Sequence, residues 1–188
     1  VKLPANDSLG PICARMDDAQ DYRGWDFWMQ RRQVGMHIIH RWPDSALKVV
    51  GKNQIPANQW THVAVTYDGS QKASGVRVFY DGHQQPTNVE ADRLADTIRT
   101  AVPLKIGQRH VGQPLSGVVI QDLRIFRRAV SPAEISTLAK FGQVVHILAN
   151  QPAQRTPSQA DQLFGWWLEA MYPRYRDLSA QLTKLERE

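Results

Sequence analysis

Two short runs of β-favouring residues, each ending in Asp-Gly, constrain the fold of this chain more than any other feature. The first run, residues 60–67, reads Trp-Thr-His-Val-Ala-Val-Thr-Tyr and precedes Asp68-Gly69. The second run, residues 76–80, reads Val-Arg-Val-Phe-Tyr and precedes Asp81-Gly82. β-Branched and aromatic residues favour strands, and glycine readily adopts the positive φ that tight hairpin turns require. We therefore predict two neighbouring strands of an antiparallel sheet.

Further short apolar runs between turn residues predict additional strands. They cover residues 9–16, 27–30, 36–40 and 47–50, a stretch near 102–106, and residues 118–126. In the last run the alternation places Leu123 and Ile125 toward the core. The pattern weakens between residues 83 and 101, which we interpret as a long connection. Many short strands without alternating helices indicate a β-sandwich rather than a doubly wound fold.

Four motifs occur in an order that resembles the laminin-G-like, concanavalin-A-like jelly-roll family, close to the pentraxins. They are Trp-x-His-Val-Ala-Val-Thr-Tyr-Asp-Gly at 60–69, Val-x-Val-Phe-Tyr-Asp-Gly at 76–82, Ile106-Gly107, and the segment from Gly117 to Phe126. The resemblance spans about residues 1 to 135. It implies a mainly β fold, an antiparallel jelly-roll sandwich, with one or two early strands upstream of Val1.

A narrower resemblance covers more of the chain. Three segments, together with a helical tail after Gln151, are similar to the laminin-G-like insert of large multidomain cytochrome-c-type proteins of planctomycete bacteria. These segments are residues 24–28, 37–43 and 46–50. The resemblance implies a piece of a larger secreted or periplasmic protein. This sequence contains no Cys-x-x-Cys-His motif, so no haem is expected within it.

The chain changes character after residue 130. Ser131 can cap a helix, Pro132 suits the first helical position, and Glu134 completes a capping box. We expect this helix, at about residues 131–140, to close a sandwich domain that covers residues 1–150. A second short helix is predicted at residues 143–149.

Residues 151–188 are predicted to form a helical extension that leads to the next domain. Thr156 can cap a helix that runs to about Tyr172, and Pro173 separates it from a second helix. The second helix carries one narrow apolar stripe, made of Tyr175, Leu178, Leu182 and Leu185. Such a stripe requires a helical partner. We expect a neighbouring domain of the parent protein, or another copy of the chain, to supply it.

Composition limits the classes of partner. The 188 residues include 23 Lys and Arg and 18 Asp and Glu, which gives a net charge of +5. This balance fits a solvated basic surface, or an anionic partner such as an acidic or sulfated polysaccharide. The basic residues are scattered, so nucleic acid is not indicated. No apolar run approaches the roughly 18 residues of a membrane span, and the single cysteine, Cys13, is predicted to be a buried apolar residue.

An enzymatic function finds little support in the sequence. Glycoside hydrolases with a jelly-roll fold commonly place the carboxylates of Glu-x-Asp-x-x-Glu on one strand. The nearest match begins at Glu90 and Asp92, but it lacks the third carboxylate and lies in the region interpreted as a connection. The histidines do not cluster, and no nucleophile motif occurs. We therefore predict that the domain is not an enzyme.

Calcium and sugar are the two ligands that the sequence favours. Asp17, Asp18 and Asp21 place hard oxygen donors in one loop, as calcium prefers; the alternative is a solvated acidic loop. Sugar binding needs exposed aromatic faces beside polar groups, for which the candidates are Trp25, Trp42 and the neighbouring Arg41. Trp28 and Trp60 are expected in the core.

Two functions remain open at this point. The first is a non-catalytic recognition module, for carbohydrate as the family resemblance implies. The second is a structural spacer that packs against neighbouring domains and binds no small ligand. A recognition module should expose Trp42 and the acidic loop in one concave face, whereas a spacer should bury Trp42 and leave the loop disordered.

Overall fold

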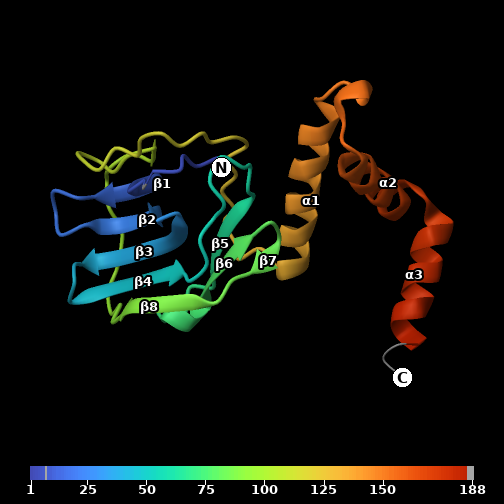
Figure 1. Ribbon diagram of the computed structural model, residues 1–188. Helices are drawn as coiled ribbons and strands as arrows, with labels where there is room; N and C mark the ends of the chain where they lie inside the picture. Colours follow the sequence, from blue (N-terminus) through green and yellow to red (C-terminus); the bar gives the residue numbers. More distant parts are fainter. Residues whose placement is uncertain (7, 186–188) are drawn as a thin grey trace. The chain divides into compact units, whose positions relative to one another are not determined.

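The computed structural model describes residues 1–6 and 8–185 of the chain (Figure 1). The chain divides into two compact units, Val1–Ser136 and Thr137–Glu188. The first unit contains all the strands, and the second consists of helices joined by short turns.

The larger sheet of the first unit has six antiparallel strands in the order β8-β4-β3-β2-β1-β9. Its strands are β1 (Gly10–Asp17), β2 (Arg23–Gln30), β3 (Gln33–Arg41), β4 (Ser45–Gly51), β8 (Thr87–Asp92) and β9 (Lys105–Ile106). The four central strands follow one another along the chain and pair as a meander, as Figure 1 shows.

The smaller sheet contains the two runs that end in Asp-Gly. Its strands are β5 (Val63–Tyr67), β6 (Val76–Tyr80) and β7 (His83–Gln84), in the order β5-β6-β7, with a short 3-10 turn at Ala73–Gly75 between β5 and β6. Gly69 has φ 84° and Gly82 has φ 83°, a conformation that favours glycine. The two predicted neighbouring strands are therefore confirmed, and each ends at its Asp-Gly pair.

Apolar side chains from both sheets meet between them. One cluster joins Met29 and Val34 of the larger sheet to Val78 and Tyr80 of β6, and the Val34 N–H donates a buried hydrogen bond of 3.1 Å to the Tyr80 hydroxyl. A second cluster joins Ile38, Leu47 and Val49 to Val76. The predicted fold class, a mainly antiparallel β structure followed by C-terminal helices, is confirmed.

Strand β2 gives the two faces of the larger sheet different roles. Trp25, Phe27 and Met29 point to the inner face and pack with the clusters between the sheets. Asp26 and Trp28 alternate with them and lie on the outer face, which turns away from the smaller sheet. The alternation thus separates neighbouring residues onto opposite sides of one sheet.

Three sequence expectations about the strands are wrong. Residues 118–126 form no strand: within the described residues their β pairing is an isolated bridge between Val119 and Lys2, outside both sheets, and Ile125 is 54% exposed. The presumed connection between residues 83 and 101 contains β7 and β8, so the segment with Glu90 is a strand. Trp60 is 37% exposed rather than in the core; it precedes β5 and forms an isolated bridge to Lys2.

Helix α1 (Pro132–Leu148) is continuous and replaces the two short helices that the sequence predicts. Its capping box is confirmed: the Glu134 N–H donates to Ser131 Oγ at 3.3 Å, and the Ser131 N–H donates to Glu134 Oε2 at 2.9 Å. Val130 and Ile135 flank this box and are buried, which fits the hydrophobic contact typical of a helix start.

The second unit continues from α1 through a 3-10 turn (Pro152–Gln154) to α2 (Pro157–Met171) and α3 (Pro173–Leu185). Thr156 and Gln159 form the capping box of α2, so the predicted cap is confirmed. Residues 186–188 of the expected extension lie outside the described residues, and the domain boundary at 150 stays a prediction. Within residues 1–6 and 8–185, no helix has both the length and the apolar character that crossing a membrane requires.

Candidate functional site

A buried carboxylate is the centre of the outer face. Asp26 of β2 is fully buried, and its Oδ1 lies 2.7 Å from Nδ1 of His37 on the neighbouring strand β3. Its Oδ2 accepts a hydrogen bond from Nε of Arg109 at 2.8 Å and lies 2.7 Å from Nη2 of the same guanidinium, as an ion pair. His37 and Arg109 are also buried. The carboxylate is thus paired on both oxygens, as a buried charge requires.

The pKa of Asp26 reflects this pairing. Complete burial disfavours the charged form, but the opposing effects of His37 and Arg109, through charge and hydrogen bonds, are larger in sum and lower the pKa of Asp26 below its ordinary value. Asp26 is therefore ionised at neutral pH. Its charge holds Arg109, and with it the segment that follows β9, against the outer face.

Aromatic rings enclose the ion pair. The Arg109 guanidinium lies 4.4 Å from the Trp28 ring centre and 5.1 Å from that of Tyr22, as cation–π contacts. Trp28 also meets the His37 ring edge to face at 5.2 Å. Trp28 is 5% exposed, so its predicted burial is confirmed, although it packs on the outer face and not between the sheets.

Trp42 stands at the exposed edge of this cluster. Its ring is 38% exposed and meets His37 at 6.0 Å and 89°, an edge-to-face contact. Its backbone N–H donates to the Asp21 carbonyl at 3.0 Å, so the end of β3 lies beside the acidic turn. Arg41 and Asp44, both largely exposed, pair at 3.7 Å next to it. The structure thus brings Trp42, Arg41 and the acidic turn together.

The three aspartates of the acidic turn are used differently from one another. Asp18 accepts backbone hydrogen bonds from Val111 at 2.8 Å and from Gly112 at 2.7 Å. Partial burial raises its pKa, but these hydrogen bonds outweigh that effect and lower it. Asp17 accepts from the Ala19 N–H at 3.2 Å.

No group of three or more His, Cys, Asp or Glu side chains in the described part of the chain is arranged to hold a metal ion. Asp18 already uses both carboxylate oxygens to hold the loop at residues 111–112. Calcium binding by Asp17, Asp18 and Asp21 stays a prediction, which needs the turn to rearrange.

The carboxylates of β8 are occupied by structural contacts. Glu90 pairs with Lys48 at 2.7 Å and accepts a hydrogen bond of 3.1 Å from Gln30, which in turn accepts from the Trp28 indole at 3.0 Å. Asp92 accepts from the Ala73 N–H at 2.8 Å. These contacts connect the outer face with the edge of the sheet.

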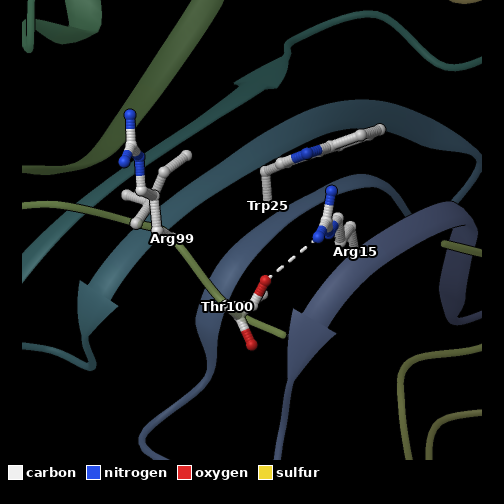
Figure 2. A pocket seen from close by; sticks show the side chains of 5 residues that line it. Arg15, Trp25, Arg99 and Thr100 are labelled. Carbon is white, nitrogen blue, oxygen red and sulfur yellow. Dashed lines mark hydrogen bonds between the residues drawn. The ribbon is translucent and has the colours of Figure 1, made fainter. Parts of the chain in front are cut away.

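Trp25 faces a cavity on the inner side of the sheet, away from Trp42. The cavity has a volume of about 390 Å³ and is lined by Arg15, Trp25, Ile98, Arg99 and Thr100. Figure 2 shows Arg15 and Trp25 rising from neighbouring strands, with Arg99 and Thr100 on the segment that passes over them. The structure therefore separates Trp25 from Trp42 and Arg41, which the sequence had grouped.

Several residues of these two regions were missed by the sequence analysis. Arg15 could have been found, because it pairs with Trp25 across β1 and β2. Asp26 and His37 pair in the same way across β2 and β3. Arg109 comes from 83 residues beyond Asp26, and no local pattern indicates that contact.

Comparison with known proteins agrees with the fold. The family model Laminin_G_3, described as the concanavalin A-like lectin/glucanases superfamily, matches residues 1–136. Among solved structures, the chain is similar to residues 221–444 of an S-layer domain-containing protein from Clostridium thermocellum, with 21% identity and a TM-score of 0.36. That match covers 74% of this chain and 66% of the other. No curated protein matches. Because the family match covers most of the chain, this protein belongs to the concanavalin A-like lectin/glucanase superfamily.

Proposed function

We propose that residues 1–136 form a non-catalytic recognition module for carbohydrate, and that Trp42 is the ring on which a sugar stacks. The observation that carries this proposal is the exposure of Trp42, a residue that is 38% accessible and whose ring meets His37 edge to face. An indole face packs well against the apolar face of a sugar ring, while neighbouring polar groups bind its hydroxyls. Membership of a lectin and glucanase superfamily supports the same class of ligand.

The surroundings of Trp42 favour binding because they are fixed before a ligand arrives. The Trp42 N–H bond to Asp21 holds the backbone, and the buried His37–Asp26 pair holds the ring that Trp42 contacts. A preformed site loses less conformational entropy on binding. Arg41 and Asp44 lie next to the ring with exposed side chains, and they offer a donor and an acceptor for sugar hydroxyls.

The ligand that we propose is a polysaccharide, with acidic or sulfated chains favoured by the net charge of +5. We place the module in a secreted or periplasmic protein, where such polymers occur. The narrower resemblance to inserts of planctomycete cytochrome-c-type proteins suggests a large multidomain parent.

The contacts that three carboxylates make within the fold support a binding function without catalysis. A glycosidase needs two carboxyl groups that flank one bond, about 5 to 9.5 Å apart. Asp26 is enclosed, Glu90 is bound by Lys48 and Gln30, and Asp92 holds the Ala73 N–H. Each of these groups already serves the fold.

A glycan array screened with calcium and with chelator tests the proposal, using the wild type, Trp42→Ala and Trp60→Ala. Trp60 is a matched control, because it is 37% exposed and belongs to another part of the unit. We expect Trp42→Ala to weaken glycan binding at least about tenfold, as for a tryptophan that anchors an interface. Trp60→Ala should retain binding.

Three other outcomes are informative. Binding that is lost only in chelator would support calcium in the turn at Asp17, Asp18 and Asp21. An equal loss of glycan binding in Trp42→Ala and Trp60→Ala would reject Trp42 as the ring on which the sugar stacks. No binding of any glycan, in either condition, would reject carbohydrate recognition.

The second candidate function, a spacer between domains, is favoured by the helical unit. Trp167 stacks on Phe164 at 6.1 Å and on Tyr172 at 5.6 Å, and all three rings are largely exposed. Leu178, Leu182 and Leu185 of α3 are more than half exposed as well. Apolar surface of this extent is typical of protein contacts. Absence of glycan binding, together with capture of a neighbouring domain by α2 and α3, would favour this function.

A further inference from the structure

The cavity beside Trp25 combines an apolar wall with two positive charges. Trp25 and Ile98 supply the wall, and Arg15 and Arg99 supply the guanidinium groups. In Figure 2 Trp25 lies beside Arg15, whose guanidinium is joined by a dashed line to Thr100, the neighbour of Arg99. The volume of about 390 Å³ lies in the range of small-molecule sites.

Neither arginine is neutralised by the chain itself. Within the described residues, no Asp or Glu forms an ion pair with Arg15 or Arg99. Two like charges that border one cavity repel each other, although both arginines are exposed residues and water screens the repulsion. An anion in the cavity would remove this repulsion.

Arg15 is also held in place. Its Nε donates to the Val102 carbonyl at 3.1 Å, and its Nη2 donates to the Thr100 carbonyl at 3.2 Å. These bonds orient the guanidinium plane without cancelling its charge, and Nη1 remains as a further donor. A fixed guanidinium recognises the planar or tetrahedral oxygens of carboxylate and sulfate better than an ammonium group does.

We propose that this cavity is a second binding site, which takes the sulfate or carboxylate group of an acidic sugar. The anionic group lies between Arg15 and Arg99, and the sugar ring packs against Trp25. The inference rests on the proposed function for the class of ligand, but the site is separate, because Trp25 and Trp42 lie on opposite faces of the sheet.

The test measures the affinity of the whole chain by titration calorimetry for three oligosaccharides of equal length: dextran sulfate, polygalacturonate and neutral dextran. The first two separate sulfate from carboxylate as the bound group. The variants are Arg99→Gln, Arg15→Lys and the control Arg77→Gln. Arg77 is an exposed residue of β6, so its substitution changes the net charge equally on the other sheet. Thermal unfolding verifies that each variant is folded.

We expect the wild type to bind at least one acidic oligosaccharide and to bind neutral dextran at least about tenfold more weakly. Arg99→Gln should weaken acidic binding about tenfold, the loss for one hydrogen bond to a charged group, while Arg77→Gln should stay within about twofold. Arg15→Lys keeps the charge but loses the planar donors, so it should also weaken binding.

Other results would contradict the proposed second binding site. Equal weakening by Arg99→Gln and Arg77→Gln would show diffuse attraction to the net charge. Tighter binding of a single-stranded oligonucleotide of equal charge would show a nucleic-acid surface instead. If Trp42→Ala abolishes acidic binding and Arg99→Gln does not, the second site fails while the proposed function stands. The reverse result would support this site and reject the Trp42 platform.

Discussion

Arginine occurs on both faces of the larger sheet, in opposite electrostatic situations. On the outer face, Arg109 is buried and held by both its ion pair to Asp26 and the rings of Trp28 and Tyr22. On the inner face, Arg15 and Arg99 border a cavity and lack a carboxylate partner among the described residues. Strand β2 supplies the central residue of each region, since Asp26 and Trp25 are neighbours in sequence.

The comparison distinguishes an arginine that stabilises the fold, Arg109, from two arginines that can bind a ligand, Arg15 and Arg99. A buried cation that is paired with a carboxylate fixes two segments to each other, and removal of either partner leaves an uncompensated charge. A cation at a cavity without an acidic neighbour keeps its charge available to a ligand, even where, as at Arg15, it also donates hydrogen bonds to backbone carbonyls.

Asp26→Asn should destabilise the protein most. The substitution leaves Arg109 buried without its counter-charge, so the free energy of unfolding should fall by about 3 to 5 kcal/mol. Denaturant unfolding measures the change. Asp44→Asn is the matched control, because the exposed Arg41–Asp44 pair should contribute at most about 1 kcal/mol. Equal losses in the two variants would contradict a structural role for the buried pair.

Acid should reveal the same pair when the wild type is compared with Asp26→Asn, because both proteins carry the same other titrating groups. The pKa of Asp26 is lowered in the folded state, so its contribution to stability is present above the ordinary carboxyl pKa of about 3.9 and is lost as pH falls through the lowered value. The free energy of unfolding, measured from pH 7 to pH 2, should therefore decline more in the wild type than in Asp26→Asn. Parallel curves would contradict the assignment.

Asp18→Ala should have an intermediate effect. The variant loses two acceptors for the amides of Val111 and Gly112, and we expect a loss of about 1 to 2 kcal/mol in the free energy of unfolding. The measurement is made with calcium and with chelator. An equal loss in both conditions would agree with the hydrogen bonds alone, whereas a loss that appears only with calcium would favour the metal prediction for this turn.

The effect expected for Cys13 is the smallest, and it concerns the reactivity of its thiol, not the free energy of unfolding. Burial, followed by the charge of Asp26, raises the pKa of its thiol to about 12, and only a thiolate reacts readily. Thiol reagents at pH 8 should leave Cys13 unmodified in the folded protein and modify it in denaturant. Rapid modification of the folded chain would contradict the packing around β1.

Local signals in the sequence predicted local structure well. The Asp-Gly pairs at 68–69 and 81–82 mark the ends of β5 and β6, and the capping residues Ser131 and Thr156 mark the starts of two helices. These features depend on residues close together in the chain. The run at 118–126 shows the limit of such signals, because a strand needs a paired neighbour and this run forms only an isolated bridge, Val119 opposite Lys2, within the described residues.

The sites depended on information that a local pattern does not contain. Trp25 and Trp42 were grouped by residue type, but strand alternation puts Trp25 on the inner face, while Trp42 lies beside His37 of the outer face. Asp26 reads as an ordinary polar residue between two aromatics, and its burial requires Arg109 from a distant loop. Charge pairing across the fold therefore decides which of these residues serve structure.

One comparison tests the contrast between the two faces most directly. Thermal unfolding of Arg109→Lys and Arg99→Gln is measured with and without the dextran sulfate oligosaccharide. We predict that Arg109→Lys lowers the unfolding midpoint but keeps the stabilisation by ligand, since ligand bound to the folded state raises the midpoint. Arg99→Gln should keep the midpoint and lose most of that stabilisation. If Arg99→Gln lowers the midpoint as much as Arg109→Lys and keeps the stabilisation, the division into a structural and a binding arginine is wrong.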